Sequence, residues 1–522
     1  MESSTDLTCG VLGTAAGDPE SLQRFVVGRD RRPTPLDQAA IADLGDPFAT
    51  LLLAKGVFPR TPAQLLDALD DAIGGNDKDP LAPQQTFVVG EGSQLELGAP
   101  LRGIRSFLIT RGRGGEGPDM IVSTRGPDAE FIEVMAWDRT VQGFNYYQTR
   151  ADSPWVLAGN SADALVSGSA GSGPFESHPS GSPLMKELRF PWVHWSSSAA
   201  KIQDDIAGPE LASHPWFARK SGAQVLEKAM MAAITRWTSA RLAAAVAADG
   251  TVADPGGILR SFLDTPTVNL VSSKVQTSNA FGGREDSFDI PQAFFVDSEC
   301  LKGILGLPSP DPAQLTVSSA AYRQVLTDHG VALRADGTTI AGPPEDTNFL
   351  FVVPERAFED VATVAGAIEM GLVSSRLAAC LLMVDFANPV FSDRRKALLG
   401  RVPTTATIVD KQSSFSEDFA NAILNAPAAS EEGSPEHEFK QLWEVGDDWP
   451  TRFKELLNAY YAAFAPVLRT PDGLERAFQL AESRRNGVRA MPINEHPLLF
   501  ATPDPPLTKT MRMQPNGQIV EG

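Results

Sequence analysis

The sequence has little cysteine and no long apolar run. Its 522 residues include three cysteines, Cys9, Cys300 and Cys380, which lie far apart and form no CxxC pair. This spacing suggests neither a disulfide framework nor a cysteine-based zinc site. The first residues lack the basic and apolar stretches of a signal peptide, and no run approaches about 18 consecutive apolar residues. We therefore expect a soluble protein of the reducing cytoplasm that does not enter a membrane.

Positive charge is also scarce. Lysine and arginine total 45 against 65 aspartates and glutamates, which gives a formal net charge of −20. A chain of this charge is repelled by phosphate backbones at long range unless a local basic patch intervenes. The basic clusters at 29–32, 394–396 and 484–485 are too small and isolated to be such a patch. We expect a small-molecule ligand and no nucleic acid, and the sequence leaves the oligomeric state undefined.

Two common catalytic motifs are missing, the GxxxxGK[ST] phosphate loop and the GxSxG nucleophile elbow. A GxGxxG pattern does occur at residues 112–117, but Pro118 and a strand-like run follow it instead of a helix, which favours a hairpin loop. One S-x-x-K pattern, Ser198 to Lys201, would place an amine base one helical turn from a hydroxyl. The KTG partner motif is absent, so a serine hydrolase is the less favoured alternative.

The composition and the apolar periodicity predict an α+β protein of enzyme size. Apolar residues make up 42% and charged residues 21%, as in ordinary globular proteins. The first half reads as an antiparallel β-meander and the C-terminal part as mostly helical. The predicted regions are a helical N-terminal region (1–83), a meander with a Gly/Ser loop and a long helix (84–255), a mixed and then helical region (256–502) and an extended Pro-rich tail (503–522).

Short apolar runs and capping residues define individual elements. Thr61 and Ser374 are predicted N-caps, and Ser213 is predicted to cap a long helix from Pro215 to Ala247. Residues 131–137 and 144–149 form the clearest predicted hairpin. The predicted strands of the first half are 86–90, 106–110, 120–124, 131–137, 144–149 and 155–159, and those of the second half are 267–273, 292–297 and 348–354.

Histidine is sparse, yet half of the six histidines fall between residues 178 and 214. Two imidazoles and one carboxylate can bind a divalent metal such as iron and leave positions open for substrate. His178, His194 and Glu187, with Glu176 as the alternative carboxylate, are the predicted metal ligands. The competing interpretation is that these histidines make ordinary structural hydrogen bonds.

The same segment carries the aromatic residues predicted to contact substrate, Phe175, Trp192, Trp195 and Trp216. Lys186 is predicted to orient an acidic group of the substrate. Asp385 follows an apolar helix, where burial would suit it to acid–base catalysis, although it could instead cap a turn or pair with Arg394 or Arg395. These residues predict an enzyme acting on a small or medium organic molecule in an aromatic-lined pocket, as a metal-dependent oxidoreductase. The alternative from another class is a non-catalytic ligand- or partner-binding protein.

Overall fold

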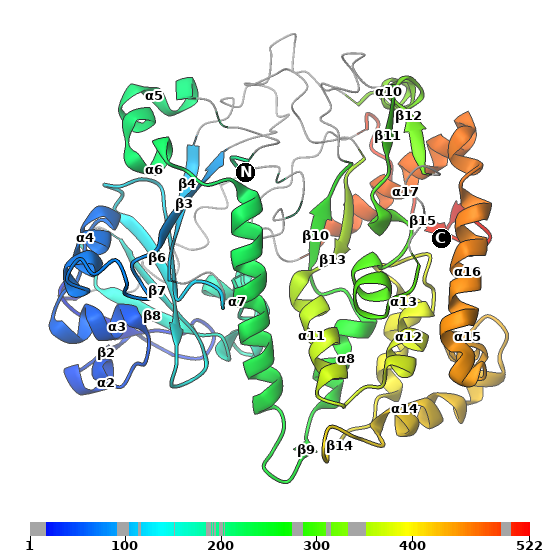
Figure 1. Ribbon diagram of the computed structural model, residues 1–522, viewed down its shortest axis with the longest axis horizontal. Helices are drawn as coiled ribbons and strands as arrows, with labels where there is room; N and C mark the ends of the chain where they lie inside the picture. Colours follow the sequence, from blue (N-terminus) through cyan, green and yellow to red (C-terminus); the bar gives the residue numbers. More distant parts are fainter. Residues whose placement is uncertain are drawn as a thin grey trace.

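A single long helix, α7 (Ala223–Ala244), lies between a sheet and a mostly helical half of the molecule (Figure 1). The computed structural model describes residues 17–90, 104–112, 116–150, 152–183, 189, 192, 195–197, 202, 204–273, 286–308, 315–331, 351–491 and 503–522. Both helices and strands are present, so the predicted α+β class is confirmed. Within those described ranges, no helix combines the length and the apolar character needed to cross a membrane.

The sheet of the first half has eight strands in the order β2-β1-β8-β7-β6-β5-β4-β3. These strands are β1 (Leu22–Arg24), β2 (Thr34–Leu36), β3 (Gln84–Gly90), β4 (Ile104–Arg111), β5 (Met120–Thr124), β6 (Phe131–Asp138), β7 (Gly143–Arg150) and β8 (Trp155–Asn160). Strands β3 to β8 pair antiparallel in chain order. The prediction of a pure meander is wrong in one respect, because β1 adds parallel to β8 and makes the sheet mixed. A three-residue strand has too little sequence to signal this pairing.

Turn chemistry explains the predicted hairpin, which is confirmed as β6–β7. Asp138 closes the connection because its carboxylate accepts hydrogen bonds from the backbone N–H groups of Thr140 (2.7 Å) and Val141 (3.1 Å). The glycine-rich loop at 112–117 joins the antiparallel strands β4 and β5, as the hairpin interpretation predicted. Gly117 has a positive φ of 85°, and a Cβ there would lie 2.6 Å from the backbone of Ala233 on α7, so the site requires glycine.

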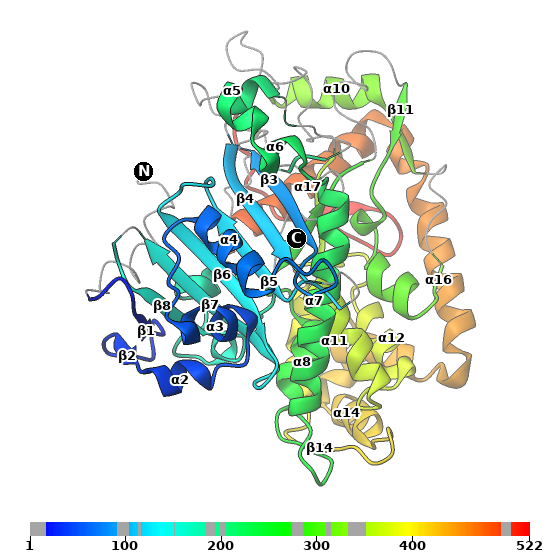
Figure 2. The same cartoon turned by 60° about the vertical axis from the view of Figure 1, so that its left-hand side comes forward.

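Helices cover both faces of the sheet, which is why β7 is buried along almost its whole length. One face packs against α3 (Pro47–Leu51) and α4 (Pro62–Ala72), whose caps are Asp46 and the predicted Thr61. Figure 2 shows these two helices in front of the sheet, together with α2 (Gln38–Ala42). The other face packs against α7 through Leu226, Met230 and Trp237.

The outer edge of β3 is covered by backbone from two later segments. Ser196 N–H donates to Val88 O at 2.9 Å, and Ser221 N–H donates to Thr86 O at 2.7 Å. This second bond corrects the predicted helix from Pro215 to Ala247: it is two helices, α6 (Pro215–Ala218) and α7, because the chain between them is held at the sheet edge. His214, not Ser213, is the N-cap of α6, and Ser213 ends α5 (Asp204–Ser213).

The second half is built from short strands and many helices. Its strands are β9 (Thr251–Val252), β10 (Val268–Val271), β11 (Ser287–Asp289), β12 (Thr316–Ser318), β13 (Val353–Arg356), β14 (Ala406–Thr407), β15 (Met511–Met513) and β16 (Ile519–Glu521). Its α-helices are α8 (Pro255–Leu263), α10 (Ser319–Asp328), α11 (Phe358–Glu369), α12 (Ser375–Met383, capped by Ser374 as predicted), α13 (Asp393–Ala397), α14 (Phe415–Leu424), α15 (Pro435–Trp443), α16 (Trp449–Phe464) and α17 (Pro471–Arg489). The segment predicted as a strand at 292–297 is instead a short helical turn, η4 (Gln292–Phe294), followed by the helical segment η5 (Glu299–Ile304).

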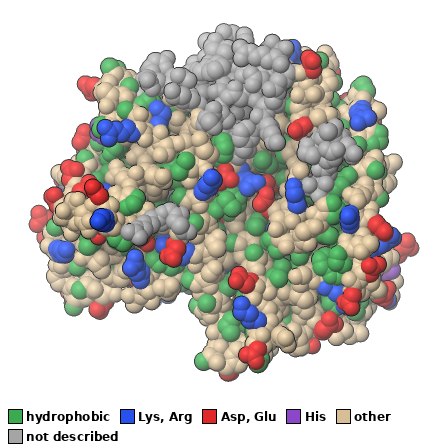
Figure 3. Space-filling model, in the orientation of Figure 1, with side chains coloured by type: hydrophobic (Ala, Val, Ile, Leu, Met, Phe, Trp, Pro, Cys, Tyr) green, Lys and Arg blue, Asp and Glu red, His purple; other side chains and the backbone are tan. Residues whose placement is uncertain are grey.

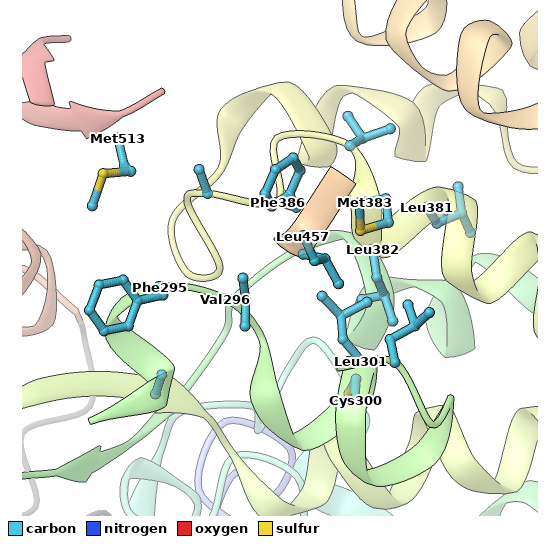
Figure 4. Packing of buried hydrophobic residues seen from close by; sticks show 14 of the residues in the cluster. Phe295, Val296, Cys300, Leu301, Leu381, Leu382, Met383, Phe386, Leu457 and Met513 are labelled. Atoms are coloured by element: carbon cyan, nitrogen blue, oxygen red, sulfur yellow. The ribbon is translucent and has the colours of Figure 1, made fainter. Parts of the chain in front are cut away.

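One large hydrophobic core holds this half together. Figure 4 shows Leu381, Leu382 and Met383 of α12 near Leu301 of η5 and Leu457 of α16. The chain after Pro503 had been expected to be extended, but its last part is a β15–β16 hairpin that buries Met511, Met513 and Ile519 in the same core. The hydrophobic residues of this hairpin alternate, which gives it one apolar face.

Leu382→Ala is expected to lower the free energy of unfolding by about 2–5 kcal/mol, because the side chain is fully buried and its loss leaves a cavity. Val409→Ala is the matched control: Val409 is 62% exposed, so its change should stay within about 0.5 kcal/mol. Urea denaturation followed by circular dichroism measures both. Equal effects of the two substitutions would contradict the assignment of Leu382 to the core.

Candidate functional site

The aromatic residues predicted to contact substrate are divided between the two faces of the sheet. Phe175 and Trp195, each 1% exposed, belong to the core on the α7 face. Trp216 belongs to the core on the opposite face. The structure therefore does not bring these three side chains together, and the role of each in substrate binding stays a prediction. The indole N–H of Trp195 has no hydrogen-bond partner among the described residues.

His178 follows the helical turn η3 (Gly173–Glu176) and packs its ring 5.4 Å from that of Tyr146. Its Nδ1 lies 3.0 Å from the carbonyl oxygen of Ser182. Since a carbonyl only accepts, the proton is on Nδ1. Burial lowers the pKa of His178 to about 4, so the ring is neutral at pH 7.

The rest of the predicted metal set is not placed. His194, Glu187 and Lys186 lie outside the described residues, as do Ser198 and Lys201. Glu176 is described, and burial raises its pKa. In the part of the chain that the structure describes, no three histidine, cysteine or acidic side chains are arranged to hold a metal ion. The metal site therefore remains a prediction.

Asp385 lies between α12 and α13 with a positive φ of 53°. Its carboxylate accepts hydrogen bonds from Asn388 Nδ2 (2.8 Å) and Ser392 Oγ (2.6 Å), and it pairs with Arg512 at 3.0 Å. Arg394 and Arg395, the expected partners, bind elsewhere: Arg394 pairs with Glu438, and Arg395 donates to backbone carbonyls. These contacts tie β15 to the loop after α12, and a catalytic role for Asp385 stays a prediction.

A different set of charged side chains meets where the two halves touch. We call it the junction cluster, and its members are Arg189, Trp192, Glu227 of α7, Glu299 of η5 and Glu355 of β13. The guanidinium of Arg189 contacts Glu355 at 2.8 Å, Glu299 at 3.0 Å and Glu227 at 3.8 Å. One cation is thus shared by three carboxylates from three different elements.

Trp192 completes the cluster from the side of the sheet. Its backbone has a positive φ of 57°, which is uncommon for a bulky residue. Its indole N–H donates a hydrogen bond to Glu227 Oε2 at 2.8 Å. Trp192 is therefore the one predicted aromatic residue that lies beside several ionisable groups at the boundary of the two halves.

The members of the junction cluster differ in exposure, and we call the partly exposed side chains its rim and the buried ones its floor. The side chains of Arg189, Glu227 and Glu299 are 22%, 19% and 28% exposed, whereas Glu355 is 4% exposed. Figure 3 shows basic and acidic side chains next to one another in the middle of this face, between α7 and the β10–β13 pair. Solvent thus reaches the side chains of Arg189, Glu227 and Glu299, while the carboxyl of Glu355 is shielded from it.

Shielding changes the proton affinity of Glu355. Burial raises its pKa, Arg189 lowers it, and the nearby charges of Glu299, Glu227 and Asp297 raise it, with a net value of about 8. Glu355 is therefore mostly protonated at pH 7. Burial also raises the pKa of Glu227, although the Trp192 hydrogen bond and Arg189 oppose the shift. A neutral carboxyl next to carboxylates is the arrangement that general acid–base catalysis uses.

Asn269 lies on the floor beside Glu355. The two residues are direct cross-strand partners in the antiparallel β10–β13 pair, so their side chains share one face. Asn269 is fully buried, and neither its Oδ1 nor its Nδ2 has a partner in the described structure. Glu355 Oε1 is similar: its 2.8 Å contact with Nε of Arg189 lacks hydrogen-bond geometry. Buried polar atoms are rarely left unpaired, so these atoms indicate a site for something else.

A second buried ion pair supports the floor from below. Arg356, the residue after Glu355, pairs with Asp297 and also donates to the carbonyl oxygen of Ser261. Asp297 in turn accepts a hydrogen bond from Cys300 N–H at 3.2 Å, which fixes the start of η5. The pair is charge-neutral, so it positions β13 and η5 without offsetting the negative charge of the junction cluster.

Sequence reasoning missed Arg189, Glu227, Glu299, Glu355 and Asn269, because none of them belongs to a motif. Two signals were available. Asn269 interrupts the apolar run of a predicted strand, and Glu355 follows directly after another apolar run. A polar residue inside an apolar strand must have a partner or a function.

Comparison with known proteins returned no match: no family model, no curated protein and no solved structure resembles this chain. The chemistry of the junction cluster is therefore the basis on which a function is inferred. Its defining features are a buried carboxyl with a raised pKa, two neighbouring carboxyl groups, one shared arginine and an amide without partners among the described residues.

The stability of the protein should depend on pH through Glu355. Its folded pKa of about 8 exceeds the usual 4.5, so the folded state holds the proton more tightly and loses stability as pH rises from about 5 to 8. Glu355→Gln should remove this loss, which approaches about 1.4 kcal/mol per pH unit in that window. Chemical denaturation at pH 5 to 9 measures the slope.

Glu444→Gln is the control for this experiment, because the side chain of Glu444 is 61% exposed. It should keep the wild-type pH dependence. An unchanged slope in Glu355→Gln would show that Glu355 is ionised in the folded protein across this range.

Proposed function

We propose that the protein is a cytoplasmic enzyme that acts on a small organic molecule at the junction cluster, with Glu355 as the proton-transfer group. The observation that carries this proposal is a buried carboxyl and a buried amide on paired strands: Glu355 Oε1 and both amide atoms of Asn269 have no hydrogen-bond partner among the described residues. A purely structural cluster would be expected to satisfy these atoms. A substrate that reaches the floor would supply the missing partners.

The position of the cluster supports this proposal. Ligand sites are common where two structural units meet, because side chains from both can converge there. Here α7 contributes Glu227, η5 contributes Glu299 and β13 contributes Glu355. Trp192 donates its indole N–H to Glu227, so it is the predicted aromatic residue that we assign to this site. The predicted contacts from Phe175, Trp195 and Trp216 are not needed for it.

In the proposed reaction, protonated Glu355 donates its proton to a basic or leaving atom of the substrate. The carboxylate that remains is stabilised by Arg189, whose Nε is 2.8 Å away. A later step returns the proton to Glu355 from the substrate or from water. Positioned acid–base groups of this kind contribute roughly 10²–10⁴-fold to a rate. Because the arginine is already in place, little reorganisation accompanies the change of charge.

A metal-dependent oxidoreductase is the second candidate, favoured by one observation at His178. A histidine that donates from Nδ1 to a backbone carbonyl has the tautomer that binds metals through Nε2. His194 and Glu187 or Glu176 would complete an iron site, and Lys186 would orient an acidic substrate. The serine hydrolase with Ser198 and Lys201 and the non-catalytic binding protein are the remaining alternatives.

Glu355→Gln is expected to abolish most of the activity. Wild-type protein incubated with a small-molecule extract should consume at least one compound, measured by mass spectrometry. Glu355→Gln should slow that consumption at least about 10²-fold, since the amide cannot donate a carboxylic proton. Glu444→Gln should match the wild type. Equal consumption by Glu355→Gln, or none by the wild type across the extract, would overturn the proposal.

Metal removal separates the two candidates. If Glu355 carries the reaction, dialysis against a chelator should leave the rate of consumption unchanged, and His178→Ala should retain it. If the metal site is real, elemental analysis should find stoichiometric iron or another divalent ion. Both the chelator and His178→Ala would then abolish activity.

A further inference from the structure

We infer that the junction cluster binds a primary ammonium group with a neighbouring oxygen, as in a 2-amino alcohol, through Asn269 and the surrounding glutamates. The inference rests on the proposed function in that it concerns the same site, and it names the chemical class of the substrate. Two independent observations lead to it: the charge of the cluster and the unpaired amide on its floor.

The cluster carries more negative than positive charge. Three carboxylates share the guanidinium of Arg189, and the adjacent Arg356–Asp297 pair is neutral by itself. Lys228 is the other cation that acts on Glu227. Counted formally with Arg189 and Lys228, Glu227 and Glu299 are balanced while Glu355 is protonated, and one negative charge is in excess when Glu355 is ionised. A cationic ligand would offset this charge, whereas an anion would meet carboxylates on three sides.

The amide of Asn269 specifies what kind of cation fits. Its Oδ1 needs a donor and its Nδ2 needs an acceptor, and both atoms are buried without partners in the described residues. Glu355 Oε1 beside it also accepts no hydrogen bond. An ammonium group offers three donors, enough for Asn269 Oδ1, Glu355 and one rim carboxylate. An oxygen on the next carbon of the ligand would accept from Nδ2.

Two other cations fit less well. A quaternary ammonium carries charge but no N–H, so it would leave Oδ1 of Asn269 unpaired. A divalent metal needs several carboxylates directed at one point, and no such group exists in the described part of the chain. With an amine as the substrate, this step is the proton transfer of the proposed reaction: Glu355 gives its proton to the amine and stays ionised beside the resulting ammonium, so an ammonium taken up from solution at pH 7 releases one net proton.

Calorimetry with four small probes tests the inference at pH 7: ethanolammonium, ethylammonium, tetramethylammonium and ethylene glycol. Ethanolammonium should bind at least about tenfold more tightly than each of the other three, the effect of roughly one charged or buried hydrogen bond. Titrations in buffers of different ionisation enthalpy should show proton release on binding. That release should vanish in Glu355→Gln.

Variants locate the binding. Asn269→Leu, which removes both amide atoms at similar volume, should raise the dissociation constant for ethanolammonium at least about tenfold. Glu227→Gln, on the partly exposed rim, should also raise the dissociation constant for ethanolammonium at least about tenfold. This variant tests the inference if Asn269→Leu does not fold. Glu444→Gln should bind as the wild type does. Unchanged binding in Glu227→Gln and in folded Asn269→Leu, or equal binding of tetramethylammonium and ethanolammonium, would overturn the inference.

The outcomes also separate this inference from the proposed function. If the wild type does not bind ethanolammonium but consumes a compound in a Glu355-dependent way, the ammonium ligand is wrong and the proposed enzyme activity stands. If ethanolammonium binding depends on Asn269 but the protein consumes no compound, the ammonium ligand stands and the proposed enzyme activity is wrong.

Discussion

The packing of α7 against two separate hydrophobic cores is the constraint on which the rest of the structure depends. Leu226, Met230 and Trp237 pack on the sheet, while Leu242 near the end of the same helix packs in the core of the second half. Arg241 adds a hydrogen bond of 2.7 Å to Thr363 of α11. Because one rigid helix serves both cores, the halves are fixed relative to each other, and Glu227 is held opposite Glu299 and Glu355.

Burial of Glu355 determines the electrostatics of that junction. An isolated carboxylate in such a place is costly, and a carboxyl relieves the cost either by pairing or by taking up a proton. Glu355 contacts Arg189 and also has a raised pKa, because Arg189 is shared with Glu299 and Glu227. The result is a group that can change charge near neutral pH. An amide without partners beside it makes the floor polar where a hydrophobic floor would be more stable.

The sheet also explains why aromatic residues that are close in sequence do not lie together in the structure. Residues 195–196 pair with the outer edge of β3, whereas Trp216 and Phe217 of α6 pack in the core on the other side of the sheet. Trp195 consequently lies on the α7 face and Trp216 on the opposite face, although they are close in sequence. The aromatic residues of this segment thus signalled core packing, and the sheet separates Trp195 from Trp216. Trp192 also packs on the α7 face, and its indole N–H reaches Glu227 at the boundary of the halves.

Elements with local signals could be predicted from the amino-acid sequence. Runs of β-branched and aromatic residues with turn residues between them set β5, β6, β7 and β8 nearly to the residue, and Thr61 and Ser374 began the helices they were expected to cap. The other features depend on long-range packing. They are the parallel pairing of β1 with β8, the helical turn at 292–294, the break before Ala223, and the meeting of Arg189, Asn269 and Glu355. A hydrogen bond within a turn depends on neighbours along the chain. A charge pair between residues far apart along the chain depends on where both ends are packed, which no local pattern records.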